Sequence, residues 1–148
     1  MKRNIYFPII LVAVIFSATV AQAQEATKRE RVVFEPGTIV SSQTGRVADS
    51  RQRASSTPYD ANIIGVATTE ENKLSVYDVL QTDGISLVRY NDENGSIKKG
   101  DFITASSKAG ESMKATGDGI VLGAALEDAN PSNKFLKVRI LIQYYNKK

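Results

Sequence analysis

The chain has 148 residues, with 19 lysines and arginines against 16 aspartates and glutamates, and it contains neither histidine nor cysteine. Without cysteine there is no disulfide, thiolate metal site or lipid-anchored cysteine. Without histidine, Ser-His-Asp and Cys-His arrangements and histidine-based metal sites are excluded. The charges of both signs are mixed and form no basic stripe, so we expect no nucleic-acid partner.

The first 23 residues have the pattern of a secretory signal peptide, so we expect a secreted or cell-surface protein. Lys2-Arg3 gives the positive start, residues 5–16 form an apolar run, and Ala21-Gln22-Ala23 offers a small-x-small cleavage site. The alternative is a retained anchor, but this apolar run is shorter than the roughly 20 residues that span a bilayer. Cleavage would leave about 125 residues with a net charge of about +1 and no membrane span.

Short β-strands separated by turns are predicted for the rest of the chain, and no helical periodicity persists for three turns. Residues 24–31 are polar and are predicted to be a flexible arm, followed by an all-β domain over 32–148. We expect residues 49–58 to form an exposed loop and Thr82-Asp83-Gly84 a tight hairpin. The expected strands cover residues 31–34, 38–40, 46–48, 62–68, 74–80, 85–90, 102–104, 112–115, 120–126 and 135–145.

The chain contains one pattern twice. A turn glycine, a short apolar strand and a Ser-Ser turn lead to Ile64-Gly65-Val66-Ala67, and the same features lead to Leu122-Gly123-Ala124-Ala125. This indicates two β-clip-like or barrel-like repeats in one domain, at about 32–90 and 97–145. We interpret Gly65 and Gly123 as bends that let a strand cross between sheets, with incidental glycines as the alternative.

The acidic residues give no clear metal or catalytic site. Asp101 is expected to cap backbone amides in its turn. The pairs Glu127-Asp128 and Glu70-Glu71 are expected in solvated turns, with weak calcium binding as the alternative. We therefore assign no catalytic, cofactor-binding or metal-binding residue and expect no cofactor.

A serine–lysine pair is the sharpest enzymatic option, because a desolvated lysine can deprotonate a serine. Ser106, Ser107 and Ser112 lie close in sequence to Lys108 and Lys114, but a lysine in a solvated turn stays charged and is no base. The chain is thus predicted not to be an enzyme. The tyrosines after the first 23 residues are scattered and predict no aromatic binding platform; they are Tyr59, Tyr77, Tyr90 and Tyr144-Tyr145.

Several stretches resemble a recurrent β module at the C-termini of phage tail-fibre and tail-spike proteins and of large bacterial surface proteins. They are Ile97-Lys98-Lys99-Gly100-Asp101-Phe102-Ile103-Thr104, Val121-Leu122-Gly123-Ala124-Ala125-Leu126-Glu127 and, upstream, Tyr59-Asp60-Ala61-Asn62-Ile63-Ile64-Gly65-Val66. The chain is more distantly similar to phage capsid-cement proteins. The resemblance covers about 33–143 and implies β-rich, often trimeric assembly. Some tail-spike versions are autoproteolytic chaperones of trimer formation, but no cleavage residue carries over.

These patterns favour a structural function: self-association at the cell surface or in an extracellular filament or fibre. The arm and the following strand, residues 24–34, would add a strand to a neighbouring subunit and so give a homo-oligomer. The alternative is a binding module for a glycan or an envelope protein, with residues 49–58 as the contact. A self-cleaving Ser-Lys hydrolase is the third possibility.

Overall fold

The computed structural model describes residues 34–47, 51–68 and 80–148, which lie in one compact unit, Val32–Lys148. The described residues form strands and no α-helix, so the predicted all-β class is confirmed, and none of these residues belongs to a helix that could cross a membrane. The strands are β1 (Ile39–Ser42), β2 (Gln52–Ala54), β3 (Ile63–Ala67), β4 (Leu80–Gln81), β5 (Gly84–Arg89), β6 (Phe102–Ala105), β7 (Ser112–Lys114), β8 (Gly119–Ala125) and β9 (Phe135–Tyr145).

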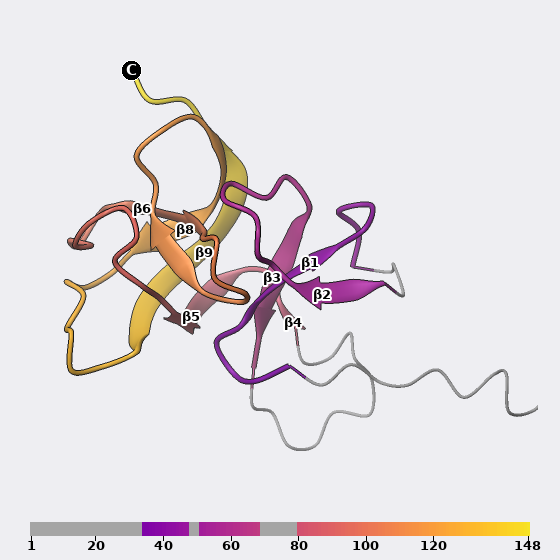
Figure 1. The fold of residues 1–148 in the computed structure, drawn as a ribbon, viewed down its shortest axis with the longest axis horizontal. Helices are drawn as coiled ribbons and strands as arrows, with labels where there is room; N and C mark the ends of the chain where they lie inside the picture. The colour runs from indigo at the N-terminus through magenta and orange to yellow at the C-terminus, as the bar shows by residue number, and fades with distance from the viewer. Residues whose placement is uncertain (1–33, 48–50, 69–79) are drawn as a thin grey trace, which may run out of the picture. The chain divides into compact units, whose positions relative to one another are not determined.

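The strands make two antiparallel sheets with the orders β2-β1-β3-β4 and β5-β9-β8-β6-β7 (Figure 1). Four strands of the second sheet, taken as β7-β6-β8-β9, follow the same order as the first sheet. The register also corresponds, because Val40 of β1 pairs with Gly65 of β3 and Ile103 of β6 pairs with Gly123 of β8. In each sheet, a glycine therefore lies opposite the second residue of the neighbouring strand, which is β1 in the first sheet and β6 in the second.

One hydrophobic core draws on both sheets. Its buried members are Ile39, Ile63, Val66, Val88, Ile97, Ile103, Ala105, Leu122, Ala125, Leu136, Val138 and Ile140. A smaller cluster of Val40, Ile64 and Ala67 packs with Phe34, Val47 and Leu80. Strands β1 and β3 are buried along their whole length, which explains why the β3 sequence is continuously apolar instead of alternating.

Strand β9 alternates as predicted along its first half, with Leu136, Val138 and Ile140 buried between exposed residues. Tyr144, four residues beyond Ile140 in the sequence, does not continue this buried face and is 64% exposed. The register of β8 against β9 shifts between Val121 and Gly123, and a bulge of this kind exchanges the two faces of a strand. As a result, the ring of Tyr145 packs against Phe102, with ring centroids 4.6 Å apart.

The polar stretch 49–58, predicted as a loop, contains strand β2. Its residues pair with β1, for example Arg53 with Ser41, and the Arg53 side chain is about half exposed. Strand β2 lies at the edge of its sheet, where polar side chains are tolerated, so it carries no hydrophobic pattern. The prediction of an exposed loop is therefore wrong for residues 52–54.

The turn at Thr82–Asp83–Gly84 does not close a hairpin. Strand β4 pairs with β3 and strand β5 pairs with β9, so the turn links the two sheets. The Gln81 side-chain amide donates hydrogen bonds to the carbonyl oxygens of Asp83 and Ile85, both at 2.9 Å, and so fixes this turn.

Other predicted strands have no full counterpart. Arg46 and Val47 lie outside the strands. Residues 31–33, 48 and 74–79 of the expected strands lie outside the described residues.

The two strand glycines do not carry a strand from one sheet into another, because β3 and β8 each stay within one sheet. Instead, the space for a Cβ at Gly65 is filled by the backbone of Gln81, and at Gly123 by that of Arg139. These two backbone positions also correspond, because Gln81 pairs with Val66 and Arg139 pairs with Ala124. The glycines are required by close approach of a neighbouring strand.

Candidate functional site

The outer face of β5 and β9 exposes large apolar side chains. Ile85 and Leu87 are 53% and 54% exposed on β5, and Phe135 and Leu141 are 37% and 58% exposed on β9. We call these four residues the β5–β9 outer face. An apolar group of this kind on two paired strands is typical of an interaction surface, whereas a single exposed leucine would need no explanation.

The register of the ladder makes this surface continuous. Leu87 pairs with Lys137 and is therefore a diagonal neighbour of Phe135, while Ile85 pairs with Arg139 and is a diagonal neighbour of Leu141. The aliphatic stems of the two basic residues extend the apolar surface, and their charged ends remain in water. The outer face is thus apolar at its centre and positively charged between its apolar members.

Strand β5 is also an edge strand, and its free edge is partly unpaired. The Arg89 amide donates to the Gly37 carbonyl oxygen at 2.9 Å, and the Ile85 carbonyl oxygen accepts from the Gln81 side chain at 2.9 Å. Both groups point away from β9, so the backbone of Leu87, midway between them, points the same way. The Leu87 carbonyl oxygen faces Gly37, whose Cβ position would lie 3.1 Å from it, so only part of this edge is open to pairing with another chain.

A groove of about 460 Å³ borders this edge. Its lining combines the start of the described chain with β5 and β9: Pro36, Gly37, Ala67, Thr68, Gln81, Ile85, Ser86, Leu87 and Phe135. The chain enters here under restraint, because Glu35 forms an ion pair with Arg89 and the Gly37 amide donates to the Ala67 carbonyl at 2.8 Å. Glu35 and Gly37 are therefore held beside the edge of β5.

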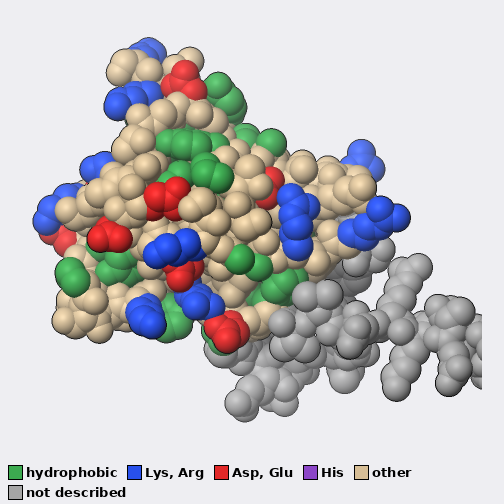
Figure 2. Space-filling model, viewed as in Figure 1, with side chains coloured by type: hydrophobic (Ala, Val, Ile, Leu, Met, Phe, Trp, Pro, Cys, Tyr) green, Lys and Arg blue, Asp and Glu red, His purple; other side chains and the backbone are tan. Residues whose placement is uncertain are grey.

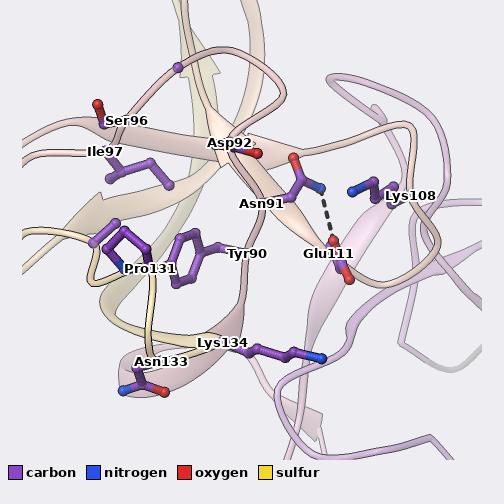
Figure 3. Close-up of a pocket in the computed structure, with 12 residues that line it drawn as sticks. Tyr90, Asn91, Asp92, Ser96, Ile97, Lys108, Glu111, Pro131, Asn133 and Lys134 are labelled. Atoms are coloured by element: carbon purple, nitrogen blue, oxygen red, sulfur yellow. Dashed lines mark hydrogen bonds between the residues drawn. The ribbon is translucent and has the colours of Figure 1, made fainter.

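A second hollow of about 570 Å³ lies among the loops that flank β5, β7 and β9 (Figure 3). One part of its wall is apolar and includes Tyr90, Ile97 and Pro131, while another part carries Asn91 and the charged side chains of Asp92, Lys108, Glu111 and Lys134. Tyr90 is held in place because its hydroxyl donates to the Asn130 carbonyl at 2.6 Å. Burial, together with the charge of Asp92, raises the pKa of Tyr90.

Asn91 anchors the polar wall of this hollow. Its side chain is 8% exposed and its amide nitrogen donates to the Ser106 hydroxyl at 2.8 Å and to Glu111 at 3.0 Å. Its side-chain oxygen accepts from the Glu93 amide at 3.0 Å. Both hydrogens of the amide nitrogen are thereby used, and one of them fixes the position of the Glu111 carboxylate.

The serines near the two lysines bond to other partners. The Ser106 hydroxyl lies 3.0 Å from the Glu111 carbonyl, Ser107 donates to Glu93 at 2.8 Å, and Ser112 donates to the Arg89 carbonyl at 2.9 Å. The Lys114 ammonium is paired with Asp101 at 2.8 Å. These contacts place none of the serines with a neutral lysine base, and the hydrolase remains an untested alternative.

The acidic side chains of Asp101, Glu127 and Asp128 accept hydrogen bonds from backbone amides. Asp101 accepts from the Lys98 amide at 2.7 Å, which confirms the predicted cap, and although burial opposes it, Lys114 and this amide hold the pKa of Asp101 below its usual value. Glu127 accepts from the Lys137 amide and Asp128 from the Lys99 amide. The described residues contain no group of three acidic side chains that could hold a metal ion. Glu70-Glu71 lies outside the described residues.

The segment predicted as a glycan or protein contact is basic. The Arg51 guanidinium donates to the Gln43 side chain at 2.7 Å, and Arg53 reaches Asp60 at 3.4 Å. Basic side chains stand out at the end of the molecule that carries β1 and β2 (Figure 2). Its shallow hollow is lined by Gln43, Arg51, Gln52 and Arg53.

Neither the β5–β9 outer face nor the Tyr90 hollow was predicted from the sequence. A signal for the first was present, since Ile85, Leu87 and Val88 form a strand in which apolar residues occupy both faces. The second depends on three loops that the sequence does not bring together, although Tyr90, Lys108 and Pro131 all lie beside turn residues.

Comparison of the chain with models of protein families, with curated proteins and with solved structures finds no match.

Proposed function

We propose that this protein is a secreted structural protein that self-associates at the cell surface or in an extracellular filament or fibre. The observation that carries the proposal is the exposed apolar β5–β9 outer face next to a partly unpaired strand edge. Together they offer a second copy both ladder hydrogen bonds and apolar contacts. The proposal includes export, because the first 23 residues have the pattern of a cleaved signal peptide.

The arm is the proposed occupant of the free edge in a neighbouring copy. Residues 24–33 precede Phe34, and Glu35 is held against β5 by its ion pair with Arg89. Two copies that approach each other at this edge would each supply an arm, so the proposal is that they exchange residues 24–33. The Val32-Val33-Phe34 run has the β-branched and aromatic residues that favour a strand, and exchange of an element is a low-cost route to oligomers.

The proposal also covers the origin of the fold, which we regard as two β-clip-like copies of one unit. In support, Gly37 donates to Ala67 and Gly100 donates to Ala125, both at 2.8 Å, at corresponding positions of the two sheets. The return bonds, Ala67 to Thr38 and Ala125 to Asp101, are both 2.9 Å. The second unit then differs by having β5 as an additional strand, and this strand carries the outer face.

Light scattering coupled to size-exclusion chromatography tests self-association. The chain from Gln24 should elute as an oligomer, and deletion of residues 24–34 should give a folded β monomer. Leu87→Lys, which places a charge at the centre of the outer face, should also shift the mass toward the monomer. Ser132→Lys, in the exposed loop before β9, is the matched control and should keep the oligomer.

The dependence of the measured mass on ionic strength and on protein concentration tests self-association further. Assembly through ladder hydrogen bonds and apolar contacts should depend only mildly on ionic strength. A monomeric mass at high micromolar concentration, unchanged by removal of the arm, would contradict the proposal. That result would favour the binding module over self-association.

A further inference from the structure

The Tyr90 hollow has the features of a ligand site and does not depend on the self-association proposed above. Its volume of about 570 Å³ falls within the range of about 300–1,000 Å³ typical of small-molecule sites. It is built from three loops, and loops on a rigid sheet are where binding residues concentrate. The loops are residues 91–97, 108–111 and 129–134.

Several charged groups in this hollow are uncommitted. Among the described residues, the ammonium groups of Lys108 and Lys134 and the carboxylate of Asp92 have no side-chain hydrogen bond or ion pair. One oxygen of Glu111 accepts from Asn91, which leaves the other free. Figure 3 shows Lys108 and Lys134 on either side of Glu111, with the Tyr90 ring beside Pro131 and below Ile97.

The wall therefore offers both hydrogen-bond donors and hydrogen-bond acceptors beside an apolar surface. Two lysines oppose two acids, so the lining carries no net charge and favours neither an anion nor a cation. A saccharide matches this combination, because each hydroxyl both donates and accepts a hydrogen bond and the C–H groups of the ring are apolar. We propose that the Tyr90 hollow binds a neutral saccharide of one or two rings.

In this arrangement the ring C–H groups contact Tyr90 and Pro131, and the hydroxyls bond to the lysine and carboxylate groups; Ile97, which is 1% exposed, supports this wall from the core. Asn91 acts as a positioning residue, since it holds Glu111 without a free group of its own. Tyr90 contributes its ring and not its hydroxyl, which is already bonded to the Asn130 carbonyl.

The test is titration of the isotope-labelled protein with maltose, lactose, cellobiose and diacetylchitobiose, followed by amide chemical shifts. At least one of these disaccharides should give saturable chemical-shift changes at Asn91, Glu111 and Lys134. We expect a dissociation constant of about 1 mM, which corresponds to weak binding. The double variant Asp92→Asn/Lys134→Met removes two exposed partners without touching the core and should weaken binding about tenfold or more. Lys137→Met, on the outer face of β9, is the matched control and should bind as the parent does.

Two results would overturn the proposal. One is the absence of localised chemical-shift changes with all four disaccharides at about 10 mM, a concentration well above the expected dissociation constant. The other is saturable binding of the zwitterion glycylglycine with no response to any saccharide, which would show that the paired charges recognise termini of peptides. Circular dichroism of the double variant must match the parent, so that loss of binding is not loss of fold.

Discussion

A Cβ built on Gly123 would stand 1.9 Å from the carbonyl oxygen of Arg139, the residue that pairs with Ala124 next to it. At Gly65 the corresponding oxygen, that of Gln81, would be 2.6 Å away. Both obstacles are backbone atoms of a paired strand, so they cannot rotate aside as a side chain could. The strand ladder itself must open to admit any other residue.

Gly123→Ala and Gly65→Ala are therefore expected to destabilise the protein by about 1–3 kcal/mol, with the larger loss at Gly123. Urea unfolding followed by circular dichroism measures both. Gly117→Ala is the control, because its Cβ would meet the Tyr59 hydroxyl at an ordinary contact of 3.6 Å. Equal stability of all three variants would show that the strand glycines are incidental.

The sequence pattern indicated that Gly65 and Gly123 must be glycines, but the interpretation that they are bends between sheets is wrong. A glycine inside an apolar strand permits a bulge, a bend or close approach, and the chain alone does not say which. The choice depends on which strand lies opposite, and the strands opposite Gly65 and Gly123 begin 15 and 12 residues further along the chain. Strand existence could be predicted locally, whereas pairing could not.

The same distinction, between what local sequence determines and what strand pairing determines, explains the other differences between the predicted and the observed fold. Strand β9 was predicted with its observed bounds because the alternation in its first half leaves a clear period. Strand β2 was missed because an edge strand of three residues needs no apolar face. The candidate sites were missed for another reason: exposure of Leu87 and the meeting of Tyr90 with Lys134 are properties of the assembled sheet and loops.

Export is the prediction that follows from the N-terminal pattern. Expression with the complete chain in a bacterial host should release a protein that begins at Gln24, detected by N-terminal sequencing or intact mass. Ala23→Leu, which removes a small residue from the cleavage site, should slow processing. Recovery of the unprocessed chain, with Met1 or Lys2 at its N-terminus, in the membrane fraction would contradict this prediction.

Tyr59 should contribute to stability through its hydroxyl, which accepts from the amides of Thr116 and Gly117, both at 2.8 Å. Tyr59→Phe leaves these two amides without their partner, so we expect a loss of about 0.5–1.5 kcal/mol and faster hydrogen exchange at both. Tyr144→Phe is the control, since that side chain is 64% exposed. The interpretation fails if exchange at these two amides is unchanged.

Asp60 should make the protein sensitive to acid. The residue is 5% exposed, and its carboxylate accepts from the Ser55 hydroxyl and the Asn62 amide, each at 2.9 Å. Burial alone would raise the pKa of Asp60, but these hydrogen bonds and the charge of Arg53 hold it below the value of 3.8 expected for the unfolded chain. The folded protein therefore stabilises the ionised carboxylate of Asp60 more than the protonated carboxyl group.

The sign of the pH dependence follows from this lowered pKa. The stabilisation is fully present above pH 3.8 and is lost as the pH falls through the lower pKa of the folded state. Asp60→Asn should reduce the free energy of unfolding at pH 7 by about 1–3 kcal/mol, and its difference from the parent should shrink as the pH falls below 3.8. Because Asp101 and Asp128 also have lowered pKa values, the difference between the two proteins is the quantity to measure, by urea unfolding at each pH. Ser55→Ala, which removes one hydrogen bond, should change the stability in the same direction by less. A difference between parent and Asp60→Asn that stays constant down to pH 3 would show that ionisation of Asp60 does not stabilise the fold.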